Sequence, residues 1–109
     1  MRLKPDTDHL LDRAAAGDVA ARQRLLERHR PRLRRMVALR LDQRLRARVD
    51  PSDVVQEALF DADQELSDYL KRRPIPFYPW LRQLAWDRLI DLNRRHIGAK
   101  KRTVDREEA

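Results

Sequence analysis

DPSDVVQEALFDADQELSDYL occupies residues 50–70 and is the stretch of the sequence that decides the fold. Asp50 can cap a helix, Pro51 suits the first helical position, and Asp53 places a carboxylate in the first turn, where the helix dipole favours negative charge. Apolar residues then recur at three- and four-residue steps, the period of an amphipathic helix. They are Val55, Ala58, Leu59, Ala62, Leu66 and Leu70. The stretch predicts a helix from Pro51 to about Leu70.

The half of the chain before this stretch shows the same helical period. Residues 1–6 are expected to form a disordered lead, and Thr7 or Asp8 can cap a first short helix that Gly17 ends. Asp18 then caps a second helix, since a side-chain oxygen at that position accepts a hydrogen bond from a first-turn N–H. Pro31 predicts a break near residues 29–30, because proline cannot continue a helix without loss of a hydrogen bond.

The last part of the chain predicts a proline-rich loop followed by a long helix. Three of the six prolines fall within residues 72–79, and Pro79 can open a helix from Trp80 to about His96 that Gly98 ends. Glycines number only two, so β-hairpin signals are absent from the sequence. We therefore predict an all-α domain, a compact bundle of three to four main helices over residues 7–98, with a basic-to-acidic tail at residues 99–109.

Length and composition narrow the class of protein. A chain of 109 residues predicts one domain, and a formal net charge of +7 favours a polyanion such as nucleic acid as partner. The alternative is a soluble helical domain whose arginines reflect a GC-rich genome. Cysteine is absent, which excludes disulfides and thiolate chemistry. No apolar run reaches the ~20 residues that span a bilayer, and residues 1–10 lack a secretory signal, so we expect a cytoplasmic protein with no membrane partner.

Nothing in the sequence resembles an active site. His9, His29 and His96 are not at metal-ligand spacing from one another or from carboxylates, and no glycine-rich loop could hold a phosphate. We predict no catalytic residue, no metal and no cofactor, and hence a protein that is not an enzyme.

An acidic ridge is expected on the helix that begins at Pro51. Asp53, Glu57 and Asp61 are four residues apart and share one helix face, with Gln56 beside them. The simplest interpretation is a solvated face near a helix N-terminus. In a chain of net positive charge, the ridge could instead dock on a basic protein surface.

A basic surface with aromatic residues is expected from Arg72 onward. Most of the aromatic residues lie there, and arginines and lysines are interleaved with them, a composition typical of proteins that grip single-stranded nucleic acid. Trp80 is expected to be a core residue. Arg94 and Arg95 are expected to contact phosphate, because no carboxylate matches them nearby. The predicted DNA-binding residues are Arg72, Arg73, Ile75, Phe77, Arg82, Gln83, Trp86, Arg88, Arg94, Arg95, Lys100 and Lys101.

Four segments together resemble one family, the bacterial sigma-70 factors. Residues 50–60 look like conserved region 2.2, and residues 77–85, FYPWLRQLA, resemble regions 2.3 and 2.4. Ile90-Asp91 followed by Arg94-Arg95 resembles the segment that comes next, and the Arg- and Leu-rich residues 25–41 resemble region 2.1. The run at residues 49–57 is similar to a branch of the extracytoplasmic-function (ECF) group that is common in planctomycetes.

This resemblance implies a transcription initiation factor. Such a domain, called σ2, binds the clamp helices of the RNA polymerase β′ subunit, and it recognises and opens the promoter −10 element. Asp53, Gln56 and Glu57 match the residues that meet the clamp helices. Residues 72–77 match the segment that receives a flipped base of the non-template strand. Arg82, Gln83, Trp86, Asp87 and Arg88 match the helix face that reads the −10 element. In the ECF group an anti-sigma factor often sequesters this domain.

The sequence departs from the family pattern in three respects, one of which is the unusually proline-rich loop at residues 72–79. Asp87 stands where the family usually has Asn, and since Asp cannot donate a hydrogen bond and repels phosphate, pairing with a nearby arginine is the alternative to base readout there. The second helical domain of an ECF factor, which binds the −35 element, does not fit into 109 residues. We expect either a σ2 portion that ends in the interdomain linker or a stand-alone σ2-like protein.

Two other functions stay open from the sequence. One is a helix-turn-helix regulator that binds duplex DNA, although neither glycine lies in the expected turn between two helices. The other is a protein-interaction module that does not bind DNA.

Overall fold

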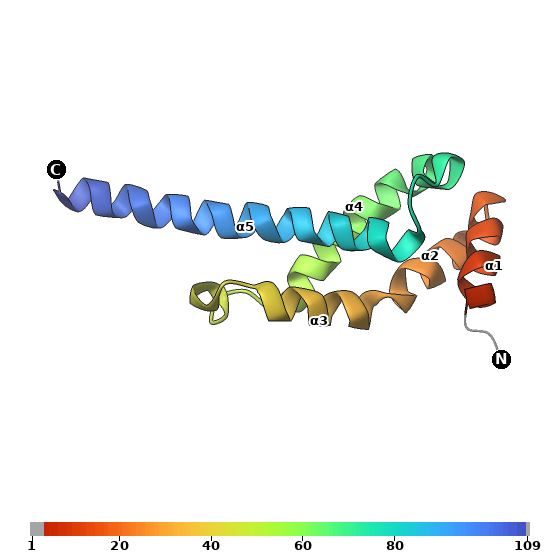
Figure 1. Ribbon diagram of the computed structural model, residues 1–109, viewed down its shortest axis with the longest axis horizontal. Helices are drawn as coiled ribbons and strands as arrows, with labels where there is room; N and C mark the ends of the chain where they lie inside the picture. The colour runs from red at the N-terminus through yellow and green to blue at the C-terminus, as the bar shows by residue number, and fades with distance from the viewer. Residues whose placement is uncertain (1–3, 109) are drawn as a thin grey trace.

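The chain folds as an all-α protein, which confirms the predicted fold class (Figure 1). The computed structural model describes the backbone of residues 4–108 and the side chains of residues 7–96. Its elements are α1 (Lys4–Ala15), α2 (Val19–Arg28), α3 (Arg30–Arg40), a short 3-10 helix η1 (Gln43–Leu45), α4 (Pro51–Arg72) and α5 (Phe77–Glu108). Among the described residues, no helix is both long and apolar enough to cross a membrane.

The first helix begins earlier than the sequence predicts. α1 starts at Lys4, so residues 4–6 belong to a helix and not to a disordered lead, and residues 1–3 lie outside the described part. Pro5 in the first turn explains this start, since proline is tolerated where the backbone N–H has no helical partner. Gly17 follows the helix with a φ of 96°, a left-handed conformation that glycine adopts without steric cost.

The local signals at the next two helix junctions are confirmed. Asp18 accepts a hydrogen bond from the N–H of Ala21 at 3.1 Å and caps α2. The helix stops at Arg28, His29 forms the junction, and α3 begins at Arg30 with Pro31 in its first turn. The proline ring therefore sets the boundary between α2 and α3.

α4 is the central helix of the fold. Asp50 accepts a hydrogen bond from the N–H of Ser52 at 2.8 Å, and the helix runs two residues beyond the predicted end, to Arg72. α4 contacts every other α-helix, and in Figure 1 it crosses between α3 and α5. Its buried face joins the fully buried leucines of its neighbours in one hydrophobic core. Those leucines are Leu25, Leu33, Leu81 and Leu89, and α4 contributes its own fully buried Leu66.

The bounds predicted for the last helix are wrong at both ends. α5 begins at Phe77 instead of Trp80, and the N–H of Trp80 donates to the Pro76 carbonyl at 3.2 Å. Pro79 fits inside the first turn because its missing N–H would have no helical partner there. At the other end the helix passes through Gly98 and continues to Glu108. A glycine inside a helix costs about 1 kcal/mol relative to alanine, and good helix formers on both sides can offset that cost.

Candidate functional site

The acidic ridge lies on the exposed face of α4. Asp53, Gln56 and Glu57 are exposed, whereas the Asp61 side chain keeps only 23% of its accessible surface. The opposite face of the helix is buried against the core, so packing fixes the direction in which the ridge faces.

Arg88 of α5 reaches across to the ridge. Its Nε donates to Asp61 at 2.6 Å and its second terminal nitrogen donates to the other Asp61 oxygen at 2.7 Å, a bidentate pair. The remaining terminal nitrogen donates to Glu57 at 3.3 Å. These hydrogen bonds lower the pKa of the Asp61 carboxyl and raise the pKa of Arg88. Arg88, which the sequence assigns to the DNA-binding surface, is thus placed on the acidic ridge and ties α5 to α4.

Arg30 organises the other edge of the ridge. Its guanidinium donates to Gln56 at 2.9 Å and to both carboxylate oxygens of Glu27, at 2.8 and 2.7 Å. A groove of about 300 Å³ runs between α2 and α4 beside these groups, and Phe60 lines it with 59% of its surface exposed. Phe60 is not among the site residues predicted from the sequence. The feature that could have identified it is the presence of an aromatic residue one position outside the apolar stripe of the helix.

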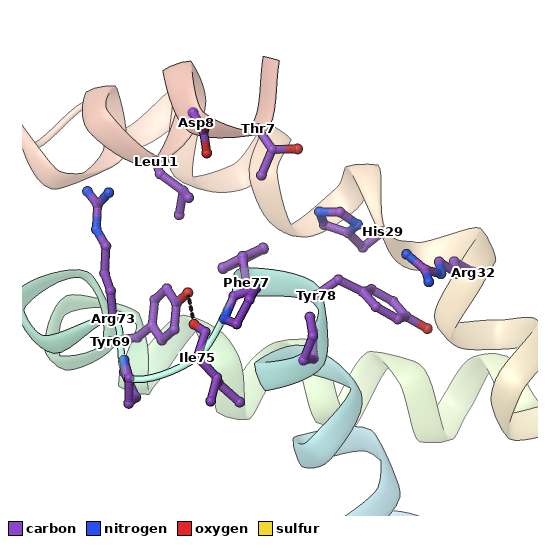
Figure 2. Close-up of a pocket in the computed structure, with 13 residues that line it drawn as sticks. Thr7, Asp8, Leu11, His29, Arg32, Tyr69, Arg73, Ile75, Phe77 and Tyr78 are labelled. Carbon is purple, nitrogen blue, oxygen red and sulfur yellow. Dashed lines mark hydrogen bonds between the residues drawn. The ribbon is translucent and has the colours of Figure 1, made fainter. Parts of the chain in front are cut away.

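The loop between α4 and α5, residues 73–76, is held by several contacts. Arg73 has a left-handed backbone with a φ of 41° and a ψ of 56°, and its N–H donates to the Tyr69 carbonyl at 2.7 Å. The Tyr69 hydroxyl donates to the Ile75 carbonyl at 2.6 Å, as Figure 2 shows. Burial raises the pKa of Tyr69, which keeps this hydroxyl protonated as a donor. The loop conformation is therefore set by the protein itself and does not need a ligand.

A cavity of about 650 Å³ opens beside this loop (Figure 2). Ile75 lines it and is 43% exposed, whereas Phe77 lies at its base and is 3% exposed. The His29 ring sits 5.5 Å from the Phe77 ring and 5.6 Å from the Tyr78 ring. Polar groups from α1, from α3 and from the loop itself border the same cavity; they are Thr7, Asp8, Arg32 and Arg73. Aromatic walls with polar groups at the edge suit a flat ring that carries hydrogen-bonding groups.

His29 is uncharged in this setting at neutral pH. Burial lowers its pKa to about 4, and the nearby charges of Arg28 and Arg32 act in the same direction. Phe77, predicted as a DNA-binding residue, is largely a core residue that shapes the cavity floor. Trp80, expected in the core, is half-buried and stacks on Tyr69 with 4.5 Å between ring centroids.

The remaining predicted DNA-binding residues are spread along α5 and its approach. Arg72 at the end of α4 and Gln83 on α5 are exposed, and Arg82 and Trp86 are half-buried. Asp87 accepts a hydrogen bond from Gln83 at 2.9 Å, so its partner is an amide and not the expected arginine.

Arg94 and Arg95 are exposed near the end of the described side chains. Arg95 forms an ion pair with Asp91, one turn earlier on α5. The expectation that no carboxylate matches Arg95 is therefore wrong, because residues four apart meet on one helix face. The side chains of Lys100 and Lys101 lie outside the described residues.

No metal site accompanies these surfaces in the described part of the chain. Within those residues, no three or more His, Asp or Glu side chains converge so as to hold a metal ion.

Comparison with known proteins gives one match. Searches of curated proteins and of solved structures found none. The family model for Sigma-70 region 2 matches residues 25–97, which is more than half of the chain. The match begins in α2 and spans α3, the acidic ridge, the loop at residues 73–76 and α5 as far as its side chains are described. The chain therefore belongs to the sigma-70 region 2 family.

Proposed function

We propose that this protein is the σ2 domain of an ECF-type sigma factor, acts in the cytoplasm and resembles the planctomycete branch. The acidic ridge docks on the clamp helices of the RNA polymerase β′ subunit. The loop at residues 73–76 and the outward face of α5 capture the opened non-template strand of the −10 element. An anti-sigma factor that covers either surface would silence the protein.

The observation that carries the docking step is the exposure of Asp53, Gln56 and Glu57 on α4 in a chain with a net charge of +7. These side chains sit on a helix that the core holds on its other face, so the ridge is rigid before any partner arrives. Complementary charge on a rigid face favours fast and correctly oriented association.

The cavity beside residues 73–76 supports the base-capture step. Extruding a base from the stack costs a few kcal/mol, and a preformed aromatic cavity with polar edges offsets part of that cost. We expect Ile75 and Tyr78 to contact the base, since both line the cavity and neither is fully buried.

The docking step is tested by pull-down of polymerase core with the Glu57→Lys variant. We expect binding to drop at least tenfold, because the new cation opposes a basic partner and repels Arg88. Glu65→Lys is the matched control, since Glu65 is an exposed glutamate further along the same helix. Equal binding by the two variants, with equal melting temperatures, would remove the ridge from the docking interface.

The form of DNA that the protein prefers distinguishes the proposed function from the duplex-binding alternative. A σ2 domain should prefer a melted −10 strand to the same sequence as duplex, whereas a helix-turn-helix regulator should prefer the duplex. A protein-interaction module should bind neither at low salt.

A further inference from the structure

The turn between α3 and α4 carries positive charge that the proposed function does not use. Residues 43–48, QRLRAR, include three arginines and no acidic residue. Arg44 donates to both carboxylate oxygens of Asp42, at 3.0 and 2.8 Å, so its charge is already matched. Arg46 and Arg48 are exposed, and among the described side chains no carboxylate forms an ion pair with either. Two guanidinium charges are therefore available to a partner.

The turn fixes the backbone from which these two side chains extend. The N–H groups of Arg48 and Val49 both donate to the Leu45 carbonyl at 2.9 Å. Leu45 is buried and Val49 packs against the hydrophobic core, so the chain is anchored on both sides of Arg46. Because the turn is ordered before a partner arrives, binding there costs little conformational entropy of the backbone.

A polar hollow of about 430 Å³ opens beside the turn. We call it the arginine hollow and define it by Arg34 of α3, by Arg46 and Arg48 of the turn, and by Asp50 and Asp53 at the start of α4. Asp53 also belongs to the acidic ridge, so the hollow and the ridge share an edge. The turn follows the last residue of α3, whereas the cavity of Figure 2 borders the beginning of that helix, so the two sites lie apart (Figure 1).

We propose that Arg46 and Arg48 bind carboxylates of the same protein partner that docks on the acidic ridge. The inference rests on the proposed function, which assigns only the ridge to polymerase, and it adds the sign of charge that the partner must carry next to its basic residues. The planar guanidinium matches a carboxylate with two parallel hydrogen bonds. A ridge of one sign attracts any basic surface, but a ridge beside two arginines is matched by a partner in one orientation. The arginine hollow thus determines orientation and specificity in docking.

Protein carboxylates fit the arginine hollow better than nucleic acid does. Asp50 and Asp53 lie beside the arginines and repel a strand of phosphates that passes through the hollow. No aromatic side chain is among the residues that line it, so unpaired bases have no ring on which to stack. A single carboxylate side chain of a protein can reach the arginines from outside without passing the two aspartates.

The first experiment is pull-down of RNA polymerase core, freed of nucleic acid, with the Arg46→Glu/Arg48→Glu variant. We expect binding to drop by about tenfold, because the new carboxylates oppose those of the partner. The matched control, Arg24→Glu/Arg35→Glu, makes the same change of net charge at exposed arginines of α2 and α3 and should bind within about twofold of the wild type. If the glutamate variant melts below its control, Arg46→Ala/Arg48→Ala replaces it, with an expected loss of about threefold.

The second experiment separates charge from the shape of the turn. Arg46→Lys/Arg48→Lys keeps both charges and loses the bidentate geometry, so it should bind core within about threefold of the wild type. A loss as large as that of the glutamate variant would overturn the proposal, because it would show that the turn and not its charge supports docking.

The outcomes distinguish the arginine hollow from the proposed function. If Glu57→Lys loses core and the glutamate variant binds it as well as its control does, the hollow is not a docking site and the proposed function stands. If neither variant loses core, both are overturned. The glutamate variant should also bind a melted −10 strand as its control does; a selective loss of the strand with core binding intact would assign the hollow to nucleic acid and overturn the inference.

Discussion

His29 is a single side chain whose protonation should affect the stability of the protein at the cavity beside residues 73–76. Its ring lies between α2 and α3 and against the rings of Phe77 and Tyr78, so it connects the helix junction to the cavity floor. Burial is the main cause of its low pKa, so the folded protein favours the neutral imidazole.

This setting predicts that stability falls as the pH drops from about 6.5 to about 4. The unfolded chain protonates His29 near 6.5, but the folded protein resists protonation down to about 4, so acid favours the unfolded state in that window. Above about 6.5 both states are neutral and this contribution is constant. Melting temperatures at pH 7.5, 6.0 and 5.0 should decline in the wild type and decline less in His29→Phe.

His9 is the control for that measurement, because it is exposed on α1. His9→Phe should keep the wild-type decline with pH. A decline that is equally steep in His29→Phe would show that other groups cause it.

At the scale of elements, the sequence predicts those features that depend only on residues close together in the chain, such as helix caps and breaks. Asp18, Pro31 and Asp50 act within one helical turn, so their caps and breaks follow from residue type alone. The acidic ridge was equally predictable, because residues four apart on a helix share a face.

The contacts between elements could not be predicted in the same way. The Arg88–Asp61 pair joins residues 27 apart, and the meeting of Arg32 with Tyr78 requires α3 to pack parallel to α5. A charge pattern along the chain carries no information on which helix packs next to which. This is why Arg88 was assigned to the basic surface and why the arginines of α3 were not assigned at all.

The course of α5 through Gly98 gives a prediction at the same scale. Because α5 continues through Gly98, Gly98→Ala should raise helicity and stabilise that segment by about 1 kcal/mol, since alanine is the better helix former. The gain should be seen as greater ellipticity at 222 nm. Gly17→Ala is the control of opposite sign, since a φ of 96° strains any side chain there, and it should lower the melting temperature. A loss of ellipticity in Gly98→Ala would mean that Gly98 ends the helix.

At the scale of the whole molecule, the net charge of +7 divides into an acidic and a basic surface that share α5. Arg88 turns toward the ridge on α4, whereas Trp86 meets the arginine of α3. Two residues along a helix correspond to a rotation of about 200°, so these side chains leave α5 on nearly opposite sides. The helix thus separates the surface proposed for polymerase from the face of α5 proposed for the −10 strand.

This separation predicts that the two binding activities can be lost independently. Glu57→Lys should lose polymerase core and keep the affinity of the wild type for a melted −10 strand within about twofold, since Glu57 does not line the cavity beside residues 73–76. Ile75→Ala/Tyr78→Ala, the cavity variant, should show the reverse pattern, since both side chains line that cavity. The combined variant should lose both, with effects that add, because sites without shared partners rarely couple. The measurements are core pull-down and strand anisotropy on all three variants. A loss of strand binding in Glu57→Lys as large as in the cavity variant would show that the surfaces are coupled, and Arg88, which touches Glu57 from α5, would be the residue to examine as the connection.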